Sequence, residues 1–262
     1  MAMPATRKEY ASGLILFDIV DAPAFIGRIT INNPSKRNAI STAMWLGLST
    51  LLDDCLVNHP TIRVLILTGQ GEVSFSSGAD LAEKEGEQTD STIPHIRLKL
   101  HHYPIPLIAQ IHGFCLGGGL GLAMSVDIRI ASSDAQFSIP AVKLGVACPK
   151  DIIDRLTQLV GESHAKLILY TGDRISAERA YSYGLVQHIC DSHRSLDEYV
   201  LELARTMSRS APLSMRAIKV MMTNETNQTE MKEAIDRCLA SNDMDEGRRA
   251  FREKRQANFQ GC

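Results

Sequence analysis

Apolar and polar residues repeat along much of the chain with the periods of both strands and helices. Strand-like apolar runs occupy residues 14–20, 25–31, 63–68, 107–111, 127–131 and 184–189. Helix-like periods are found at 93–102, 151–160, 163–170 and 177–183, and Ser41 is placed to cap a further helix that runs to about residue 57. Strands and helices in this order predict an α/β core.

The pattern changes near residue 195, after which only helical periodicity remains. Four helices are predicted there, over residues 196–207, 212–223, 229–239 and 243–257. We therefore expect two parts, an α/β core over residues 1–194 and an all-helical region over residues 195–262.

Composition and charge narrow the class of protein. The 262 residues are 44% hydrophobic and carry a formal net charge of -2, which is typical of a soluble globular protein. That charge offers no bulk attraction to nucleic acid or to an anionic membrane. No apolar run approaches the roughly 20 residues of a membrane span, and residues 1–10 lack an apolar signal-peptide core. A cytoplasmic location is the expectation.

The cysteine pattern does not indicate a metal site or a disulfide scaffold. The chain has six cysteines, and none of them are paired at CxxC spacing. We expect reduced thiols that are mostly buried, and no bound metal.

A run of three glycines, Gly117 to Gly119, is the most specific chemical signal. It follows the predicted strand at 107–111 and opens an apolar helix. Glycine is costly inside regular structure, so such a run indicates that backbone must approach something closely. The N–H groups exposed at a strand-to-helix turn bind either a phosphate or the negative oxygen of a reacting carbonyl.

A second turn of this kind contains Gly78, which also follows a buried strand. Two converging N–H groups are the minimum for an oxyanion hole. The alternative is that both turns serve packing alone. Dinucleotide binding is disfavoured because residues 117–121 do not give a clean GxGxxG spacing after a first strand.

Several blocks, taken in order, resemble the enoyl-CoA hydratase/isomerase (crotonase) superfamily over nearly the whole chain. They are residues 29–40, 65–81, 109–131, 169–186 and 246–255. The resemblance implies a spiral of ββα units followed by a helical trimerisation region. It also implies homotrimers, often paired into hexamers, and an acyl-CoA ligand, with coenzyme A present only as part of the substrate.

The resemblance also implies roles for particular residues. The backbone N–H groups of Ala79 and Gly118 become the oxyanion donors. Main-chain atoms around Ser77, Ala79 and Leu81 contact the adenine of coenzyme A, and Asp80 orients this turn. Four further residues are implied near coenzyme A, Lys36 and Arg37 at its phosphates and Phe251 and Lys254 from the C-terminal helix, in the same subunit or across a subunit boundary. Solvated surface charge is the alternative for the basic residues, and helix packing for Phe251.

The chain departs from the family where hydratases carry two glutamates. Gly121 stands at the first glutamate position and Ala141 at the second. General acid–base groups contribute about 10²- to 10⁴-fold each, so their loss changes the expected chemistry. Pro149 stands at an alternative acid position of the family and cannot serve.

Other groups in the predicted pocket are weaker candidates for proton transfer. Asp151 is a candidate acid or base, although Asp also suits the N-cap of the helix that follows it. Cys148 is more readily explained as a buried thiol, and the remaining candidates are Lys143, Lys150, His95, His101 and His102. Two functions remain open: an acyl-CoA enzyme that stabilises an enolate, and an acyl-CoA-binding protein with little turnover.

Overall fold

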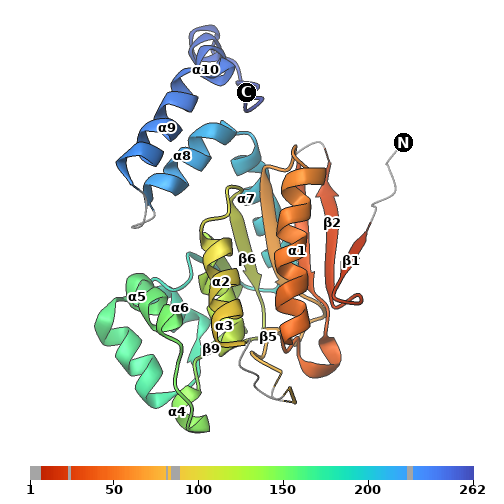
Figure 1. The fold of residues 1–262 in the computed structure, drawn as a ribbon, viewed down its shortest axis with the longest axis vertical. Coiled ribbons are helices and arrows are strands. Elements are labelled where there is room, and N and C mark those ends of the chain that lie inside the picture. The colour runs from red at the N-terminus through yellow and green to blue at the C-terminus, as the bar shows by residue number, and fades with distance from the viewer. Residues whose placement is uncertain (1–6, 23–24, 81, 84–88, 223–226) are drawn as a thin grey trace.

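The computed structural model describes residues 7–262 apart from 23–24, 81, 84–88 and 223–226 (Figure 1). In this part of the chain a larger sheet has the order β1-β2-β3-β4-β6-β8-β11. Its strands are β1 (Lys8–Tyr10), β2 (Ile15–Asp21), β3 (Ile26–Ile31), β4 (Val64–Gly69), β6 (Leu107–Ile111), β8 (Ile128–Ser132) and β11 (His188–Cys190). The first three strands pair antiparallel, and all later pairs are parallel.

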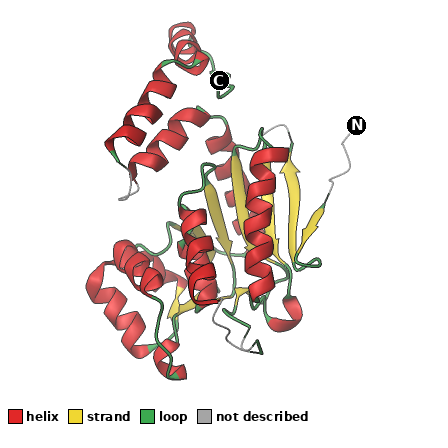
Figure 2. Cartoon of the chain, in the orientation of Figure 1, coloured by secondary structure: helices red, strands yellow, loops and turns green. Residues whose placement is uncertain are grey.

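A smaller sheet has the order β10-β9-β7-β5. Its strands are β5 (Ser74–Ser76), β7 (Phe114–Leu116), β9 (Gln136–Ser138) and β10 (Ile175–Ser176). The pairs β5–β7 and β7–β9 are parallel, so the carboxyl ends of these three strands lie along one edge. The two sheets and their helices confirm the predicted α/β class (Figure 2).

Helices connect and cover the strands. They are α1 (Thr42–Asn58), α2 (Thr89–His101), α3 (Gly118–Met124), α4 (Ala141–Leu144), α5 (Lys150–Thr171), α6 (Ala177–Ser182), α7 (His193–Ser208), α8 (Pro212–Met222), α9 (Gln228–Leu239) and α10 (Asn242–Glu253), with a 3₁₀ turn at Pro34–Lys36. Helix α5 is broken at Gly161, whose φ of 76° is not helical, which explains why the sequence predicts two helices there.

The larger sheet is buried on both faces. Leu65 and Leu67 of β4 pack in the cluster that contains α1, whereas Val64 and Ile66 pack in the cluster that contains α7. Alternate side chains of a strand point to opposite faces, so both faces of β4 are covered. Figure 1 shows α1 on one side of the sheet and α7 on the other. Helix α7 therefore packs on the sheet, although the sequence places it in the helical region.

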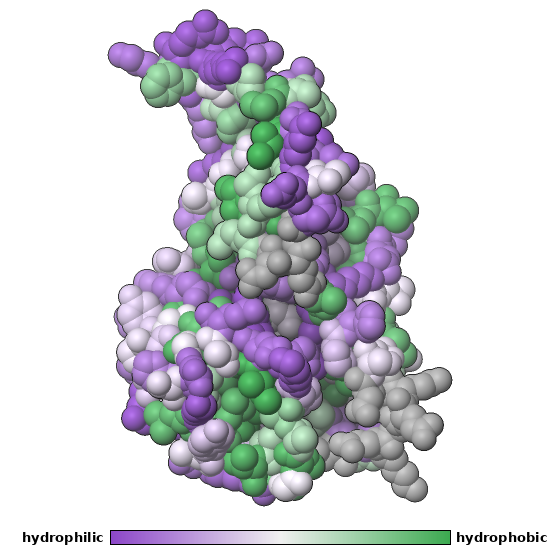
Figure 3. Space-filling view, turned by 60° about the vertical axis from the view of Figure 1, so that its left-hand side comes forward, coloured by the Kyte–Doolittle hydropathy of each residue, from purple (hydrophilic) through white to green (hydrophobic). Residues whose placement is uncertain are grey.

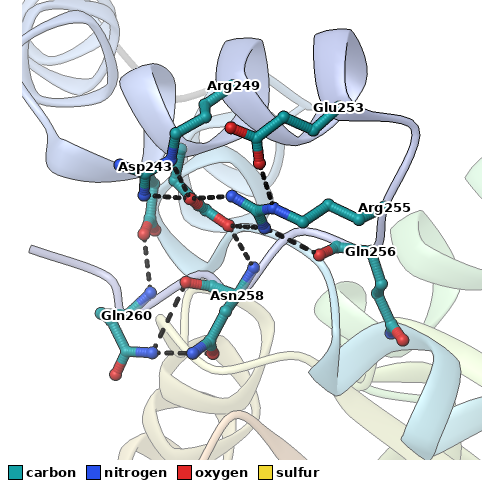
Figure 4. A network of polar contacts seen from close by, with 8 residues as sticks. Asp243, Arg249, Glu253, Arg255, Gln256, Asn258 and Gln260 are labelled. Carbon is teal, nitrogen blue, oxygen red and sulfur yellow. Dashed lines mark hydrogen bonds and ion pairs between the residues drawn. The ribbon is translucent and has the colours of Figure 1, made fainter.

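The last helices, α8 to α10, extend away from the sheets (Figure 1), and the surface at their tip is mostly hydrophilic (Figure 3). Glu246 of α10 holds the C-terminal tail, because its carboxylate accepts hydrogen bonds from Arg255 Nη1 at 2.6 Å and from Asn258 N at 2.9 Å (Figure 4). The Arg255 side chain and these other donors keep the pKa of Glu246 far below its ordinary value.

Several local predictions can be compared with the structure. Ser41 caps α1, since its Oγ accepts from Met44 N at 3.3 Å, and the strand over Leu107–Ile111 is found as predicted. The predicted strand at 184–189 is wrong in its first half, because only His188–Cys190 pairs with β8. The last helix ends before residue 257 because Lys254 adopts a left-handed φ of 53°. No helix among the described residues is long and apolar enough to span a bilayer.

Candidate active site

Three turns meet at the carboxyl edge of the smaller sheet. Strand β5 leads to Gly78 and Ala79, β7 leads to Gly117 and Gly118, and β9 leads to Ala141. Because the strands are parallel neighbours, residues far apart in the sequence lie side by side there. This parallel alignment positions the candidate site.

The first two turns are in direct contact. A Cβ placed on Gly118 would lie 3.5 Å from Ala79 N, and one placed on Gly78 would lie 2.9 Å from Leu116 O. Gly117 N is held by Ser138 O at 2.8 Å. By contrast, the N–H groups of Ala79 and Gly118 donate no hydrogen bond within the described part of the chain. Two unpaired backbone donors therefore lie close together.

The loop before α1 holds the first turn in place. Ile40 forms a bridge with Ala79, in which Ile40 N donates to Gly78 O at 2.8 Å and Asp80 N donates to Ile40 O at 3.2 Å. Asn38, which is fully buried, donates from Nδ2 to Ser74 O at 2.7 Å. The bonds to Ile40 use the Gly78 carbonyl and the Asp80 N–H. The Ala79 N–H is not used by them and is left for a ligand.

Three residues predicted to contact coenzyme A, namely Lys36, Arg37 and Ser77, lie together beside this turn. Lys36 Nζ forms an ion pair with Asp80 Oδ2 at 2.6 Å, and the pairing lowers the pKa of Asp80. Ser77 N donates to Arg37 O at 3.0 Å. Leu81, which was also predicted to contact coenzyme A, lies outside the described residues.

The two positions at which the resemblance predicts hydratase glutamates, Gly121 and Ala141, hold no carboxylate. A Cβ on Gly121 would lie 3.0 Å from Ile152 Cδ1 and 3.7 Å from Arg97 Cδ, so these two side chains fill the adjacent space. Ala141 is the first residue of α4 and packs against the core. The structure thus provides neither of the two acids at these positions.

A carboxylate does reach this region from α5. Asp151 Oδ2 accepts from Arg97 Nε at 2.6 Å, and Asp151 Oδ1 accepts from Arg97 Nη2 at 3.0 Å. Arg97 is only 7% exposed. The prediction that Asp151 caps the helix is wrong, because Pro149 is the N-cap and Asp151 lies within the first turn, where it pairs with Arg97.

A cavity of ≈ 220 Å³ lies between α2, the end of α3 and α5. Arg97 and Asp151 line it together with Ser125, His101 and Arg155. Burial and the nearby charge of Arg155 lower the pKa of His101 to about 4, so this imidazole is neutral at pH 7. Arg97, which lines the cavity, also packs beside the Gly121 position.

The other candidates for proton transfer are placed less favourably. Burial raises the pKa of the Cys148 thiol, which opposes its use as a nucleophile. The amines of Lys143 and Lys150 form ion pairs with Asp173 and Asp154 respectively. Two further histidines remain: on α2, His95 Nδ1 lies 3.0 Å from Ser91 O, and His102, which directly follows α2, lines the cavity.

The C-terminal residues are not part of this cluster within one chain. Phe251 is 86% exposed on α10, and Lys254 follows the same helix. Figure 1 shows α10 at the far end of the molecule from β5 and β9. The described residues contain no group of three or more His, Cys, Asp or Glu side chains arranged to hold a metal ion.

Arg97 and Arg155 were not singled out by the sequence analysis. An isolated arginine on a polar helix is indistinguishable in sequence from a solvated charge. The available signal was Gly121 itself, because a missing side chain on a buried helix face requires another residue to fill the space.

Comparison with known proteins finds a matching family and similar sequences. The sequence model of a family described as enoyl-CoA hydratase/isomerase matches residues 21–262. The chain is 35% identical over 242 residues to a crotonyl-CoA hydratase of Syntrophomonas wolfei, covering 87% of this chain and 92% of that protein. It is 32% identical over 243 residues to the 2,3-dehydroadipyl-CoA hydratase of Escherichia coli, covering 89% and 94%.

Solved structures with a similar fold are found as well. An enoyl-CoA hydratase from Bacillus anthracis superposes with a TM-score of 0.86 at 31% identity, covering 95% of this chain and all of that one.

Proposed function

The chain belongs to the enoyl-CoA hydratase/isomerase family, and we propose that Ala79 and Gly118 form an oxyanion hole for the thioester carbonyl of an acyl-CoA. The observation that carries this proposal is the contact between the two turns, which brings Ala79 N to 3.5 Å from the Cβ position of Gly118. Two unpaired N–H groups at one point stabilise negative charge that develops on a carbonyl oxygen.

The thioester is an appropriate partner for this pair of donors. Removal of a proton from the carbon next to the thioester carbonyl, or addition of water to an adjacent double bond, places negative charge on the carbonyl oxygen. Donors that are fixed before the reaction stabilise that charge without reorganisation, and each contributes about 10²- to 10³-fold to the rate.

The coenzyme A portion is assigned to the loop beside the first turn. Lys36 and Arg37 supply positive charge for phosphate groups, and Lys36 exchanges its bond to Asp80 for one to a phosphate when ligand binds. Main-chain atoms at Ser77 and Ala79 contact the adenine. Coenzyme A enters as part of the substrate and is not a separate cofactor.

Oligomerisation completes the proposed site. Phe251 lies on α10 and Lys254 directly follows it, and in the same chain this helix is far from β5, the strand that leads to Ala79 (Figure 1). We assign their contacts with coenzyme A to a neighbouring subunit of a homotrimer, or of a hexamer formed from two trimers.

The proton-transfer step differs from that of a two-glutamate hydratase, because Gly121 and Ala141 carry no acid. Asp151 is the proposed acid or base. Each of its oxygens accepts one hydrogen bond from Arg97, which leaves further lone pairs for a substrate proton. Its side chain is 37% exposed and lines the cavity beside Gly121.

A second candidate function is acyl-CoA binding for carriage or regulation, with little or no turnover. The observation in its favour is that Ile152 and Arg97 fill the space next to Gly121, where a hydratase presents a catalytic carboxylate.

One set of measurements separates the two functions. Binding of butyryl-CoA is measured by calorimetry, and turnover of crotonyl-CoA and of a 3-enoyl-CoA is followed in parallel. We expect saturable binding and turnover of at least one enoyl thioester, with crotonyl-CoA hydration well below that of a two-glutamate hydratase. Binding without turnover of either enoyl thioester favours the carriage function, and absence of binding contradicts both.

A further inference from the structure

One arginine that lines the cavity, Arg155, is not neutralised by the carboxylates that line the same cavity. Of these two carboxylates, Asp151 pairs with Arg97, and Asp154 pairs with Lys150 at 2.7 Å. Within the described residues Arg155 forms no ion pair. Its donors contact only neutral oxygens, at Met124 O (2.9 Å) and Gln158 Oε1 (3.3 Å).

The surroundings of Arg155 increase this local excess of positive charge. His101 lines the same cavity, and its pKa is lowered. Burial is the largest cause, and the positive charges of Arg155, His102 and Lys219 act in the same direction. Asp127 is the nearby acid that offsets this charge, and its Oδ2 already accepts from Lys219 Nζ at 2.8 Å. An anion in the cavity would therefore meet an Arg155 that forms no ion pair with any described carboxylate.

The proposed oxyanion hole lies at the other end of the same helix face. Gly118, Gly121 and Ser125 are spaced by three and four residues, which places them along one side of α3. Ser125 Oγ donates to Gly121 O at 2.8 Å, and Ser125 lines the cavity with Arg155. Seven helical residues span about 10 Å, so the Ser125 end of this face, where Arg155 lies, is within the length of an acyl chain anchored at Gly118. Ile152 and Arg97 fill the space directly beside Gly121, so such a chain must pass outside these two side chains.

We propose that this cavity selects acyl-CoA molecules whose acyl group ends in a carboxylate, which the guanidinium of Arg155 binds. The inference rests on the proposed function, because the acyl chain is oriented by the Ala79 and Gly118 donors. A guanidinium presents a planar set of donors that matches a carboxylate. Partial burial in a cavity of ≈ 220 Å³ reduces the screening of that contact by solvent.

Calorimetry with matched ligands tests the selection. Three pairs share chain length and differ only in the terminal group: butyryl- and succinyl-CoA, hexanoyl- and adipoyl-CoA, and octanoyl- and suberoyl-CoA. We expect the dicarboxylic member to bind at least about tenfold more tightly in one or more pairs, as a charge-assisted hydrogen bond gives. The preference should be largest where the chain spans from Gly118 to Arg155.

Variants of Arg155 assign the preference to this side chain. Arg155→Gln should remove the preference, so that the two members of each pair bind with the same affinity, and Arg155→Lys should retain part of the preference. Arg194→Gln is the matched control, because Arg194 lies on α7 with its side chain 89% exposed. If Arg155→Gln does not fold, the wild-type pairs and Arg155→Lys still decide the result.

The outcomes separate this inference from the proposed function. Equal affinity within all three pairs overturns the inference while the binding of the monocarboxylic ligands still supports the acyl-CoA site. A preference that survives Arg155→Gln also overturns it. Failure of all six ligands to bind contradicts the inference and the proposed function together.

Discussion

Arg97 binds both carboxylate oxygens of Asp151, with Nε 2.6 Å from Oδ2 and Nη2 3.0 Å from Oδ1. The pair joins α2 to α5 next to Gly121, in a part of the site where a hydratase carries a glutamate. Because Arg97 is buried, loss of Asp151 leaves a guanidinium without its counter-ion.

A double-mutant cycle measures this coupling. Asp151→Ala should lower the free energy of unfolding by about 2 kcal/mol, as the buried arginine is left unpaired. Arg97→Met should cost less, since Asp151 is partly exposed. The double variant should recover at least about 1 kcal/mol relative to the sum of the single variants in urea unfolding. Strict additivity would show that the pair contributes nothing to stability.

Turnover of Asp151→Asn tests the proton-transfer role. The amide keeps the size of the side chain but cannot accept a substrate proton, so we expect kcat on the best enoyl thioester to fall at least about 100-fold. Acyl-CoA affinity should remain within about twofold. Asp154→Asn is the control on the same helix, because Asp154 pairs with exposed Lys150. Wild-type kcat in Asp151→Asn would exclude Asp151 as the acid or base.

The packing of α3 against β5 is tested at Gly119. A Cβ at this position would lie 2.7 Å from Ser76 O and Ser76 Cβ, so Gly119→Ala must push the helix away from the strand. We expect a loss of about 1–3 kcal/mol in stability and a loss of activity, because the same shift separates the two oxyanion donors. Gly247→Ala is the matched control on α10, where the nearest atom would be 3.5 Å away and a small gain in stability is expected. Equal stability of the two variants would contradict this packing.

Acid should weaken the fold through His101. Its pKa is lowered to about 4 by burial and by Arg155, whereas an unfolded histidine titrates near 6.5. Between these values the unfolded state binds more protons, so stability falls as the pH is lowered through this window. Urea unfolding at pH 7 and pH 5 should show a difference of up to about 2 kcal/mol from this group. His101→Gln should reduce this difference in the free energy of unfolding by that amount. An unchanged difference between pH 7 and pH 5 in this variant would show that His101 is not the group responsible.

The sequence predicted the long elements better than the short ones. Strand β6 and the cap of α1 have clear signals, in a five-residue apolar run and in a serine before an amphipathic helix. Strands β5, β7 and β9 have three residues each, too few to show a period, although they align the site. Their pairing depends on contacts between residues far apart in the chain.

Parts of the candidate site were also predictable, where the signal lies within a short stretch of sequence. Gly118 is marked by its glycine run, and the resemblance assigns Ala79 beside it. The partner of Asp151 was not predictable, because Arg97 is 54 residues away in sequence and reaches Asp151 only through the packing of α2 against α5. The local sequence favoured a helix cap instead, which the structure places at Pro149.

The central claim is that the Gly118 N–H stabilises the thioester oxygen, and a pair of variants at this position tests it most directly. Gly118→Pro removes the N–H, whereas Gly118→Ala keeps it and adds a Cβ that meets Ala79 N at an ordinary 3.5 Å. Proline is tolerated at the first position of a helix, which is where Gly118 lies. The measurement is kcat/KM of both variants on the best enoyl-CoA. We expect a loss of at least about 100-fold in Gly118→Pro with most activity kept in Gly118→Ala. Equal activity of the two variants would show that the Gly118 N–H does not stabilise the thioester oxygen.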